Sequence, residues 1–224
     1  MRFDVLRFVA VLMLLASVGL VAGCGTSFKY QRRHAQTYLS LTNNLGVEII
    51  HAEDLRSPDE QLPKWSRKVE VIVARATADE LKHAQLFQRV KIHLSGPLAD
   101  PRYSHLVELR VKQFRYYNPT NVLDFGRNIL GWMGLRGALI ARSIPRQYIS
   151  VVEVEFAVLD ANTRQTVFQR TYSDTRNLTA NGYEGKSRQI QQMSDALETV
   201  VDQFVADLAR LPLSQSHGLN DRPR

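Results

Sequence analysis

Cys24 carries the plainest chemistry in this chain, because it is the only cysteine among 224 residues. Its thiol stands after two small residues, at the end of an apolar run that begins at Phe8. Arg2 and Arg7 precede that run, which is too short for a membrane span. An unpaired thiol in an exported chain calls for an explanation of its own. The pattern therefore predicts an N-terminal export signal that ends beside this thiol.

The four residues Val21-Ala22-Gly23-Cys24 resemble the lipobox of a bacterial lipoprotein signal. The resemblance implies a lipid anchor of the palmitate type on Cys24, cleavage before it, and a mature chain of residues 24–224. Each buried methylene of such an anchor contributes about 0.8 kcal/mol to membrane binding. Gly25 stands where lipoproteins retained on the inner membrane of many enteric-type bacteria carry Asp, so the resemblance favours the periplasmic face of the outer membrane. The alternative is an ordinary signal peptide with a leftover thiol.

Other residues that could do chemistry are scattered along the chain. The six histidines stand singly, with no pair at helical metal-ligand spacing, at positions His34, His51, His83, His93, His105 and His217. The run Gly131-Trp132-Met133-Gly134 lacks the Lys-Ser/Thr that a phosphate loop requires. Asp160 is interpreted as a turn residue that caps its own backbone. The sequence thus predicts no metal, no cofactor and no enzymatic activity.

A second feature is an apolar insertion over residues 118–146, broken by glycines and studded with arginines. It is too charged to span a bilayer, but it suits short helices on a lipid surface or in a partner's groove. The predicted contact residues are Phe125, Arg127, Ile129, Trp132, Arg136 and Leu139. The alternative, given equal weight, is a lid that folds back over an open face of the sheet.

The chain is basic, with a formal net charge of +7. Removing residues 1–23 takes away two arginines and one aspartate, which leaves +6. In an exported lipoprotein this charge favours anionic headgroups, cell-wall polymers or an acidic partner over nucleic acid. A solvated surface with spare arginines is the simpler interpretation, and Arg110 and Lys112 beside Glu108 fit it.

Two amphipathic helices and five alternating strands are expected to position these features. One helix follows Pro63 and ends near Ala84, and the other carries the strongest apolar stripe of the chain. That stripe is Ile190, Met193, Leu197, Val200, Val201, Phe204, Leu208 and Leu211. Strands are expected at 45–49, 90–94, 107–111, 152–158 and 167–172, the last two forming a hairpin.

This order of elements predicts an α+β fold, a two-layer sandwich with two long helices on one face of a sheet. The sheet is expected to have four to five strands and to be mainly antiparallel. With no disulfide available, one domain over residues 45–211 must rest on its own core. Residues 24–44 are expected to be a tether, and residues 212–224 a disordered tail.

The domain resembles the periplasmic lipoproteins that serve as auxiliary components of envelope ABC-type transport systems and, more loosely, small lipoprotein domains of envelope assemblies. The segments that carry the resemblance are Glu80-Leu81, the run from Ala84 to Val90, Val158-Leu159-Asp160 with Thr163, Thr166-Val167-Phe168 and Asp195-Ala196-Leu197. The resemblance implies a non-enzymatic protein with membrane and envelope-complex partners. The alternative is a lipid-anchored hydrolase that acts on lipid or cell wall, for which the chain shows no catalytic constellation.

Overall fold

The computed structural model covers the domain and a few residues of the segment before it. It describes residues 28, 30, 32, 45–61, 68–94, 102–119, 134, 140, 143–181 and 185–211. Cys24 and the six predicted contact residues of the insertion, Phe125, Arg127, Ile129, Trp132, Arg136 and Leu139, lie outside these described residues.

Five strands form one sheet, in the order β2-β1-β3-β4-β5. Their bounds are β1 (Gly46–Asp54), β2 (Arg89–Ile92), β3 (His105–Tyr117), β4 (Arg146–Asp160) and β5 (Thr166–Ala180). The helices are α2 (Pro58–Gln61), α3 (Val69–His83) and α6 (Gly185–Arg210). The α+β class and the five strands confirm the prediction.

The orientation of the strands is more mixed than expected. β1 runs parallel to both β2 and β3, whereas β3 with β4 and β4 with β5 are antiparallel. The reason is the connection: α3 carries the chain back between β1 and β2, and such a crossover returns the second strand in the direction of the first. The predicted hairpin joins β4 to β5.

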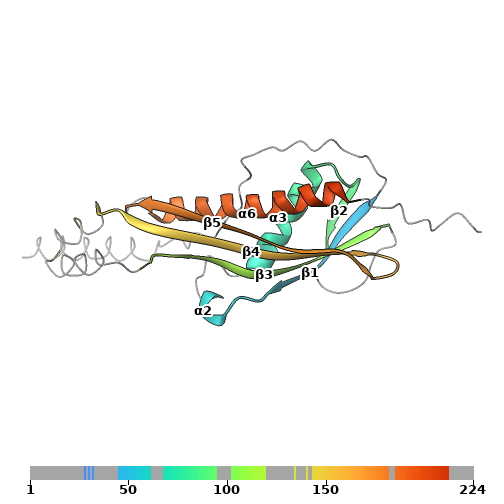
Figure 1. The fold of residues 1–224 in the computed structure, drawn as a ribbon, viewed down its shortest axis with the longest axis horizontal. Coiled ribbons are helices and arrows are strands. Elements are labelled where there is room, and N and C mark those ends of the chain that lie inside the picture. Colours follow the sequence, from blue (N-terminus) through green and yellow to red (C-terminus); the bar gives the residue numbers. More distant parts are fainter. Residues whose placement is uncertain are drawn as a thin grey trace, which may run out of the picture.

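Both long helices pack on the same face of the sheet, and α6 lies along the length of β4 and β5 (Figure 1). The predicted stripe is confirmed, because Met193, Leu197, Val200, Val201, Phe204 and Leu208 are fully buried. The α3 residues Val69, Val73 and Ala76 join the same core. Phe204 stacks on Phe156 of β4, with ring centroids 4.2 Å apart.

The buried residues between α6 and the sheet differ in polarity from one end of the helix to the other. From Val200 onward, every buried residue of α6 is apolar. Before Val200, four of the described buried residues of α6 are polar: Gln189, Gln192, Ser194 and Glu198. The facing strand residue is also polar, since the Ser150 hydroxyl donates a hydrogen bond to Oε1 of Gln192 at 3.0 Å. The sheet therefore has an aromatic end and a polar end.

Candidate functional site

Three residues of the expected tether pack on the domain. Phe28 is only 6% exposed, and its ring meets the ring of Phe114 of β3 edge-on. The Tyr30 hydroxyl donates a 2.6 Å hydrogen bond to Oε1 of Glu80, and Arg32 Nε lies 3.2 Å from Oε2 of the same carboxylate. The chain is thus held to α3 and β3 before the first strand begins.

Glu80 is the polar centre of this contact, and it is 2% exposed. A buried carboxylate is costly unless hydrogen bonds and an opposite charge compensate it, which Tyr30 and Arg32 do here. Burial and the hydrogen bond to Glu80 raise the pKa of the Tyr30 hydroxyl well above its usual range. Tyr30 therefore remains a hydrogen-bond donor at any physiological pH, and its contact with Glu80 does not depend on pH.

This contact limits how far the domain can lie from Cys24. Cys24 precedes Phe28 by four residues, and an extended chain spans at most about 3.6 Å per residue, or about 14 Å here. Phe114 lies three residues before Tyr117, where β3 ends, and Arg146 opens β4 at the same end of the sheet. The N-terminal segment is thus docked near the strand ends that flank the insertion.

The sheet face turned away from the helices is charged. The Glu155 carboxylate accepts from Lys112 Nζ at 2.6 Å, from Gln169 Nε2 at 2.8 Å and from Arg110 Nη1 at 3.3 Å. The hydrogen bond from Lys112, with that from Gln169, lowers the pKa of Glu155. The interpretation of Arg110 and Lys112 as a solvated face is confirmed, and such a face does not need an apolar cover.

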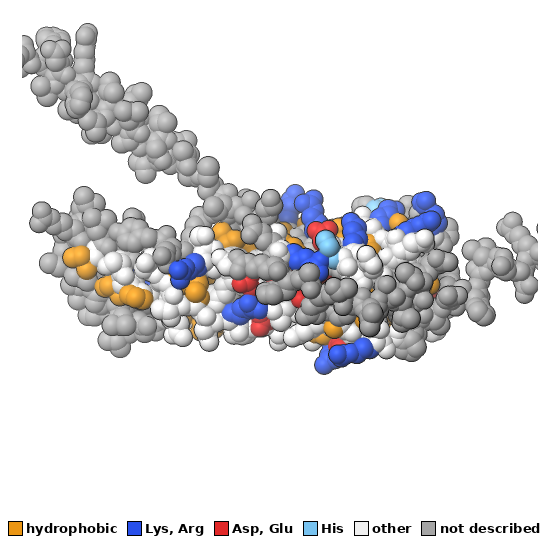
Figure 2. Space-filling view, turned by 90° about the horizontal axis from the view of Figure 1, so that it is seen from above, with side chains coloured by type: hydrophobic (Ala, Val, Ile, Leu, Met, Phe, Trp, Pro, Cys, Tyr) orange, Lys and Arg blue, Asp and Glu red, His pale blue; other side chains and the backbone are white. Residues whose placement is uncertain are grey.

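Seen from above, the basic side chains lie in several groups along the molecule, with acidic side chains beside some of them (Figure 2). Among the described residues, the basic side chains seen on this face do not form a single patch, which agrees with a solvated surface.

A serine, a histidine and an aspartate meet where β3 begins. Ser104 Oγ lies 2.9 Å from Nδ1 of His105, and it donates to the Gly46 carbonyl at 3.0 Å. His105 is 4% exposed, and burial lowers its pKa although the nearby Asp160 opposes the change. Asp160 Oδ1 accepts from the backbone N–H groups of residues 162 and 163, which lowers its pKa. Ser104, His105 and Asp160 each take part in a hydrogen bond within the fold. Asp160 accepts from the backbone of its own turn, as predicted.

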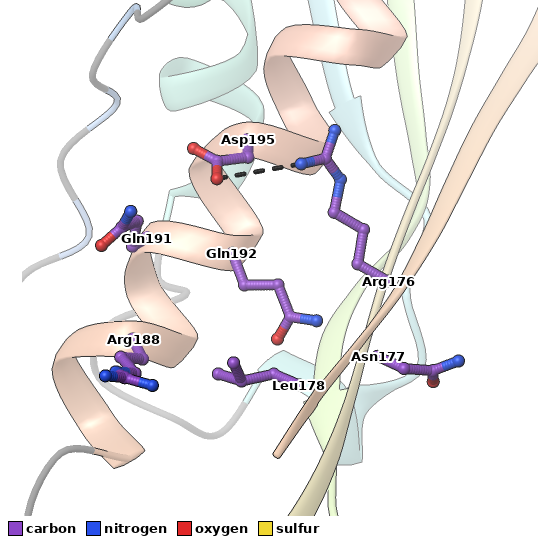
Figure 3. A pocket seen from close by; sticks show the side chains of 7 residues that line it. All are labelled: Arg176, Asn177, Leu178, Arg188, Gln191, Gln192 and Asp195. Atoms are coloured by element: carbon purple, nitrogen blue, oxygen red, sulfur yellow. Dashed lines mark ion pairs between the residues drawn. The ribbon is translucent and has the colours of Figure 1, made fainter. Parts of the chain in front are cut away.

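An open groove of about 510 Å³ lies between β5 and the N-terminal half of α6. Its lining residues are Arg176, Asn177, Leu178, Arg188, Gln191, Gln192 and Asp195. Gln192 reaches from α6 toward Leu178, whereas Gln191 and Asn177 point away from the space between them (Figure 3). The size falls within the range of small-molecule sites.

Arg176 holds one wall of the groove in place. Its Nε lies 2.6 Å from Asp174, and a terminal nitrogen donates to Thr199 of α6 at 2.6 Å. The other terminal nitrogen lies 3.8 Å from Asp195 (Figure 3). These bonds tie β5 to α6, so the spacing between strand and helix is fixed beside the groove.

Neither the docked segment nor the groove was predicted from the sequence. A signal for the first exists, because Phe28 and Tyr30 alternate with polar residues in a stretch otherwise poor in aromatics. A signal for the second is that Gln189 and Gln192 occupy positions of the α6 stripe where an apolar residue would be expected.

Neither a metal site nor a membrane-spanning helix is found in the part of the chain that the structure describes. No group of three or more His, Cys, Asp or Glu residues there could hold a metal ion. None of the described helices is both long and apolar enough to cross a membrane.

No protein-family model matches the chain, and no curated protein matches it significantly. Among solved structures, a Xanthomonas campestris protein of the DUF330 family aligns with a TM-score of 0.52 at 9% identity, over 82% of this chain and 92% of that one. A PelC dodecamer from Paraburkholderia phytofirmans aligns with a TM-score of 0.40 at 12% identity, over 80% and 96%. A minor lipoprotein from Acinetobacter baumannii gives 0.37 at 12% identity, over 73% and 91%. The chain thus shares its fold with the DUF330 protein.

Proposed function

We propose that the protein is a lipid-anchored envelope lipoprotein that acts without catalysis, as an auxiliary or assembly component of a transport or secretion complex. The lipid would be attached at Cys24, on the periplasmic face of the outer membrane. The observation that carries the proposal is the docking of Phe28 and Tyr30 on the domain, close behind the cysteine.

The docked segment matters because it makes the anchor short. A free linker of twenty residues would let the domain move over a wide volume, with an end-to-end distance of about 25 Å. With Phe28 fixed, the domain would stay within about 14 Å of the lipidated residue. A short anchor presents the same end of the sheet to the membrane at all times, which suits a protein that braces a complex at the bilayer.

The insertion supplies the second part of the proposal, the contact with a partner or the lipid surface. Ile129, Trp132 and Leu139 would give apolar contact, while Arg127 and Arg136 would attract anionic headgroups or an acidic partner. The charged outer face of the sheet supports this choice over a lid, because the Glu155 network leaves little apolar surface there to cover.

The anchor is tested with labelled fatty acid. The wild-type protein should incorporate the label and fractionate with membranes, whereas Cys24→Ser should not be labelled and should be released or retain its signal. Equal labelling of the two forms would refute the anchor. Density fractionation of the wild type then tests the outer-membrane assignment, which recovery in the inner-membrane band would overturn.

The contact surface is tested by separating binding from stability. Changing Ile129, Trp132 and Leu139 together to serine should abolish binding to liposomes or to partners captured from detergent-solubilised membranes, with the melting temperature unchanged. Changing Arg127 and Arg136 should weaken binding mostly at low salt. A lid would behave differently, because its loss would lower the melting temperature by several degrees.

A further inference from the structure

The two edges of the sheet differ in how they are protected against pairing with another chain. β2 forms one edge, and it is only four residues long, with Arg89 and Lys91 exposed. β5 forms the other edge, and its fifteen residues include no lysine, no proline and no glycine. A short strand, lysine and proline are three common means of preventing edge-to-edge pairing. β2 has two of these features, whereas β5 has none of the three.

The outer edge of β5 presents backbone groups that can form hydrogen bonds. Within the described residues, β5 pairs with β4 and with no other strand. After one register irregularity opposite Val158 and Leu159, residues 168–180 pair with β4 without interruption. In an antiparallel ladder, every second residue turns its N–H and C=O groups toward the other side of the strand. This long and regular edge therefore offers a row of donors and acceptors to which a further strand can add.

Charged side chains of both signs alternate along the side of β5 that faces α6. Arg170 donates to Asp207 of α6 at 2.7 Å, which places Arg170 on this side of the sheet. Asp174 and Arg176 follow on the same side, because alternate residues of a strand share a face. They pair with each other within the chain, at 2.6 Å. None of these charges lacks a partner, but their order selects the register of an added strand.

This order of charges favours a second copy of β5 as the added strand. An antiparallel pairing of two copies centred on Tyr172 places Arg170 of each copy opposite Asp174 of the other, and opposite charges in such pairs are stabilising. Moving the centre one residue toward the C-terminus would oppose Arg170 with Arg176. Moving it two residues would oppose Asp174 with its own copy. A shift of three residues restores opposite charges but joins a shorter stretch of the two strands.

The helix layer is compatible with this pairing. α6 packs on β4 and β5 alike and lies along both strands (Figure 1). With strands about 4.8 Å apart, the axes of the two α6 helices would lie about 10 Å apart on one side of the joined sheet, a distance at which helices pack. The Asp207 carboxylates that would approach each other there each accept from Arg170 and Tyr172. Two five-stranded sheets would thus become one continuous sheet, with helix beside helix.

We propose that the protein forms a two-fold symmetric dimer through the edges of β5, in the antiparallel register centred on Tyr172. The symmetry axis is perpendicular to the sheet, so the strand ends that flank the insertion, at Tyr117 and Arg146, lie toward opposite ends of the dimer. With the anchor proposed above, such a dimer lies along the membrane and has one lipid toward each end. The dimer itself does not depend on the anchor.

The test is sedimentation equilibrium of the full-length protein in a non-ionic detergent, over a range of protein concentrations. The wild type should be a dimer that dissociates on dilution. In the proposed register, Thr171 lies opposite Ser173 of the other copy, and both residues are exposed on the face away from α6. Thr171→Glu combined with Ser173→Glu should raise the dissociation constant at least about tenfold, because like charges then oppose each other at two positions.

The matched control is Thr171→Glu combined with Ser173→Lys, which places opposite charges at the same two positions and should bind at least as tightly as the wild type. Ser173 lies beside Glu153 of β4, so the glutamate pair may carry a cost within one chain. Thr171→Lys combined with Ser173→Lys repeats the like-charge test with the other sign and keeps it valid if the glutamate pair fails to fold. The melting temperature of the wild type should rise with protein concentration, and that of the like-charge variants should not.

A monomeric wild type would overturn the proposal. A dimer that the like-charge pairs leave intact would place the interface elsewhere, and equal weakening by the matched control would rule out the register; both results contradict the proposal. A wild type that stays monomeric until solubilised membrane proteins are added would assign the edge to another protein. None of these results depends on labelling at Cys24, so failure of the anchor would be seen separately.

Discussion

The ring of Phe28 meets the ring of Phe114 edge-on, at an interplanar angle of 90° and a centroid distance of 5.2 Å. Phe114 is fully buried, and its carbonyl accepts a 3.3 Å hydrogen bond from Arg56, which precedes α2. Phe114 of β3 thus contacts both the N-terminal segment and the chain that follows β1. Edge-to-face aromatic pairs contribute about 0.5–1.5 kcal/mol beyond the area they bury, so this contact is a specific one.

Phe28→Ala should release the N-terminal segment from the domain. Burial of a phenylalanine side chain stabilises by about 1.5–3 kcal/mol, so the midpoint of urea unfolding should fall by a corresponding amount. Limited proteolysis should cut the variant between residues 24 and 44 much faster than the wild type. Tyr117→Ala, which removes an aromatic ring that is 42% exposed, is the control and should change neither property.

Phe204→Ala should be among the most destabilising single changes in α6. Phe204 is fully buried and packs against Phe156, Phe168 and Tyr172, and truncation of a buried phenylalanine costs about 3–5 kcal/mol. Val167→Ala, at a residue 48% exposed, should cost under about 0.5 kcal/mol. Thermal unfolding of both variants checks this, and an unchanged melting temperature for Phe204→Ala would contradict the core described here.

The stability of the fold should decrease below about pH 6.5 because of His105. Burial lowers the pKa of His105 in the folded state, so the unfolded chain binds a proton at a pH where the folded protein does not. Stability is therefore complete above the ordinary histidine pKa of about 6.5 and is lost as the pH falls toward the folded-state pKa.

Urea unfolding at pH 7.5, 6.5 and 5.5 measures this effect. The decrease should be smaller in His105→Gln, because glutamine does not titrate. His51→Gln, at a side chain 50% exposed, should leave the decrease as in the wild type. An identical pH dependence in His105→Gln and the wild type would count against the role of His105.

Asp160→Ala should loosen the turn between β4 and β5. The Oδ1 atom accepts from Asn162 N at 2.9 Å and from Thr163 N at 2.8 Å, and loss of such bonds costs about 1 kcal/mol. Asp160→Asn keeps an acceptor and should recover most of the loss at neutral pH. Denaturant midpoints of the two variants give the comparison, and equal loss in both would show that the charge rather than the acceptor matters.

The helices and the centres of the strands could be predicted because their burial is periodic. Leu197, Val201, Phe204 and Leu208 recur at helical spacing, and Val152, Val154, Phe156 and Val158 alternate. The outer parts of β4 and β5 could not, since both strands continue into the polar end of the sheet. There Ser150 and Arg176 face α6, so the contrast between inward and outward residues is lost.

Strand orientation and the docked segment depend on contacts between distant residues. The helix expected between β1 and β2 already favours their parallel pairing, but that β1 also lies beside β3, and parallel to it, follows only from the assembled sheet. Tyr30 and Glu80 lie far apart in the chain, and nothing local to either residue specifies the other. The groove could not be predicted from the sequence for the same reason, because Gln192 and Leu178 come together only when α6 packs on β5.

Because the buried residues of α6 differ between the two ends of the helix, we expect that the helix does not unfold locally as one unit. Local opening costs least where few apolar contacts must be broken. The part of α6 before Val200 buries Gln189, Gln192 and Ser194 beside its apolar residues, whereas the part after it buries only apolar side chains and packs Phe204 on aromatic rings. Amide hydrogens in the part before Val200 should exchange with solvent through partial unfolding, while those near Phe204 should exchange only when the whole molecule unfolds. The polar end of the sheet would then open by brief fraying of one helix, with the rest of the domain intact.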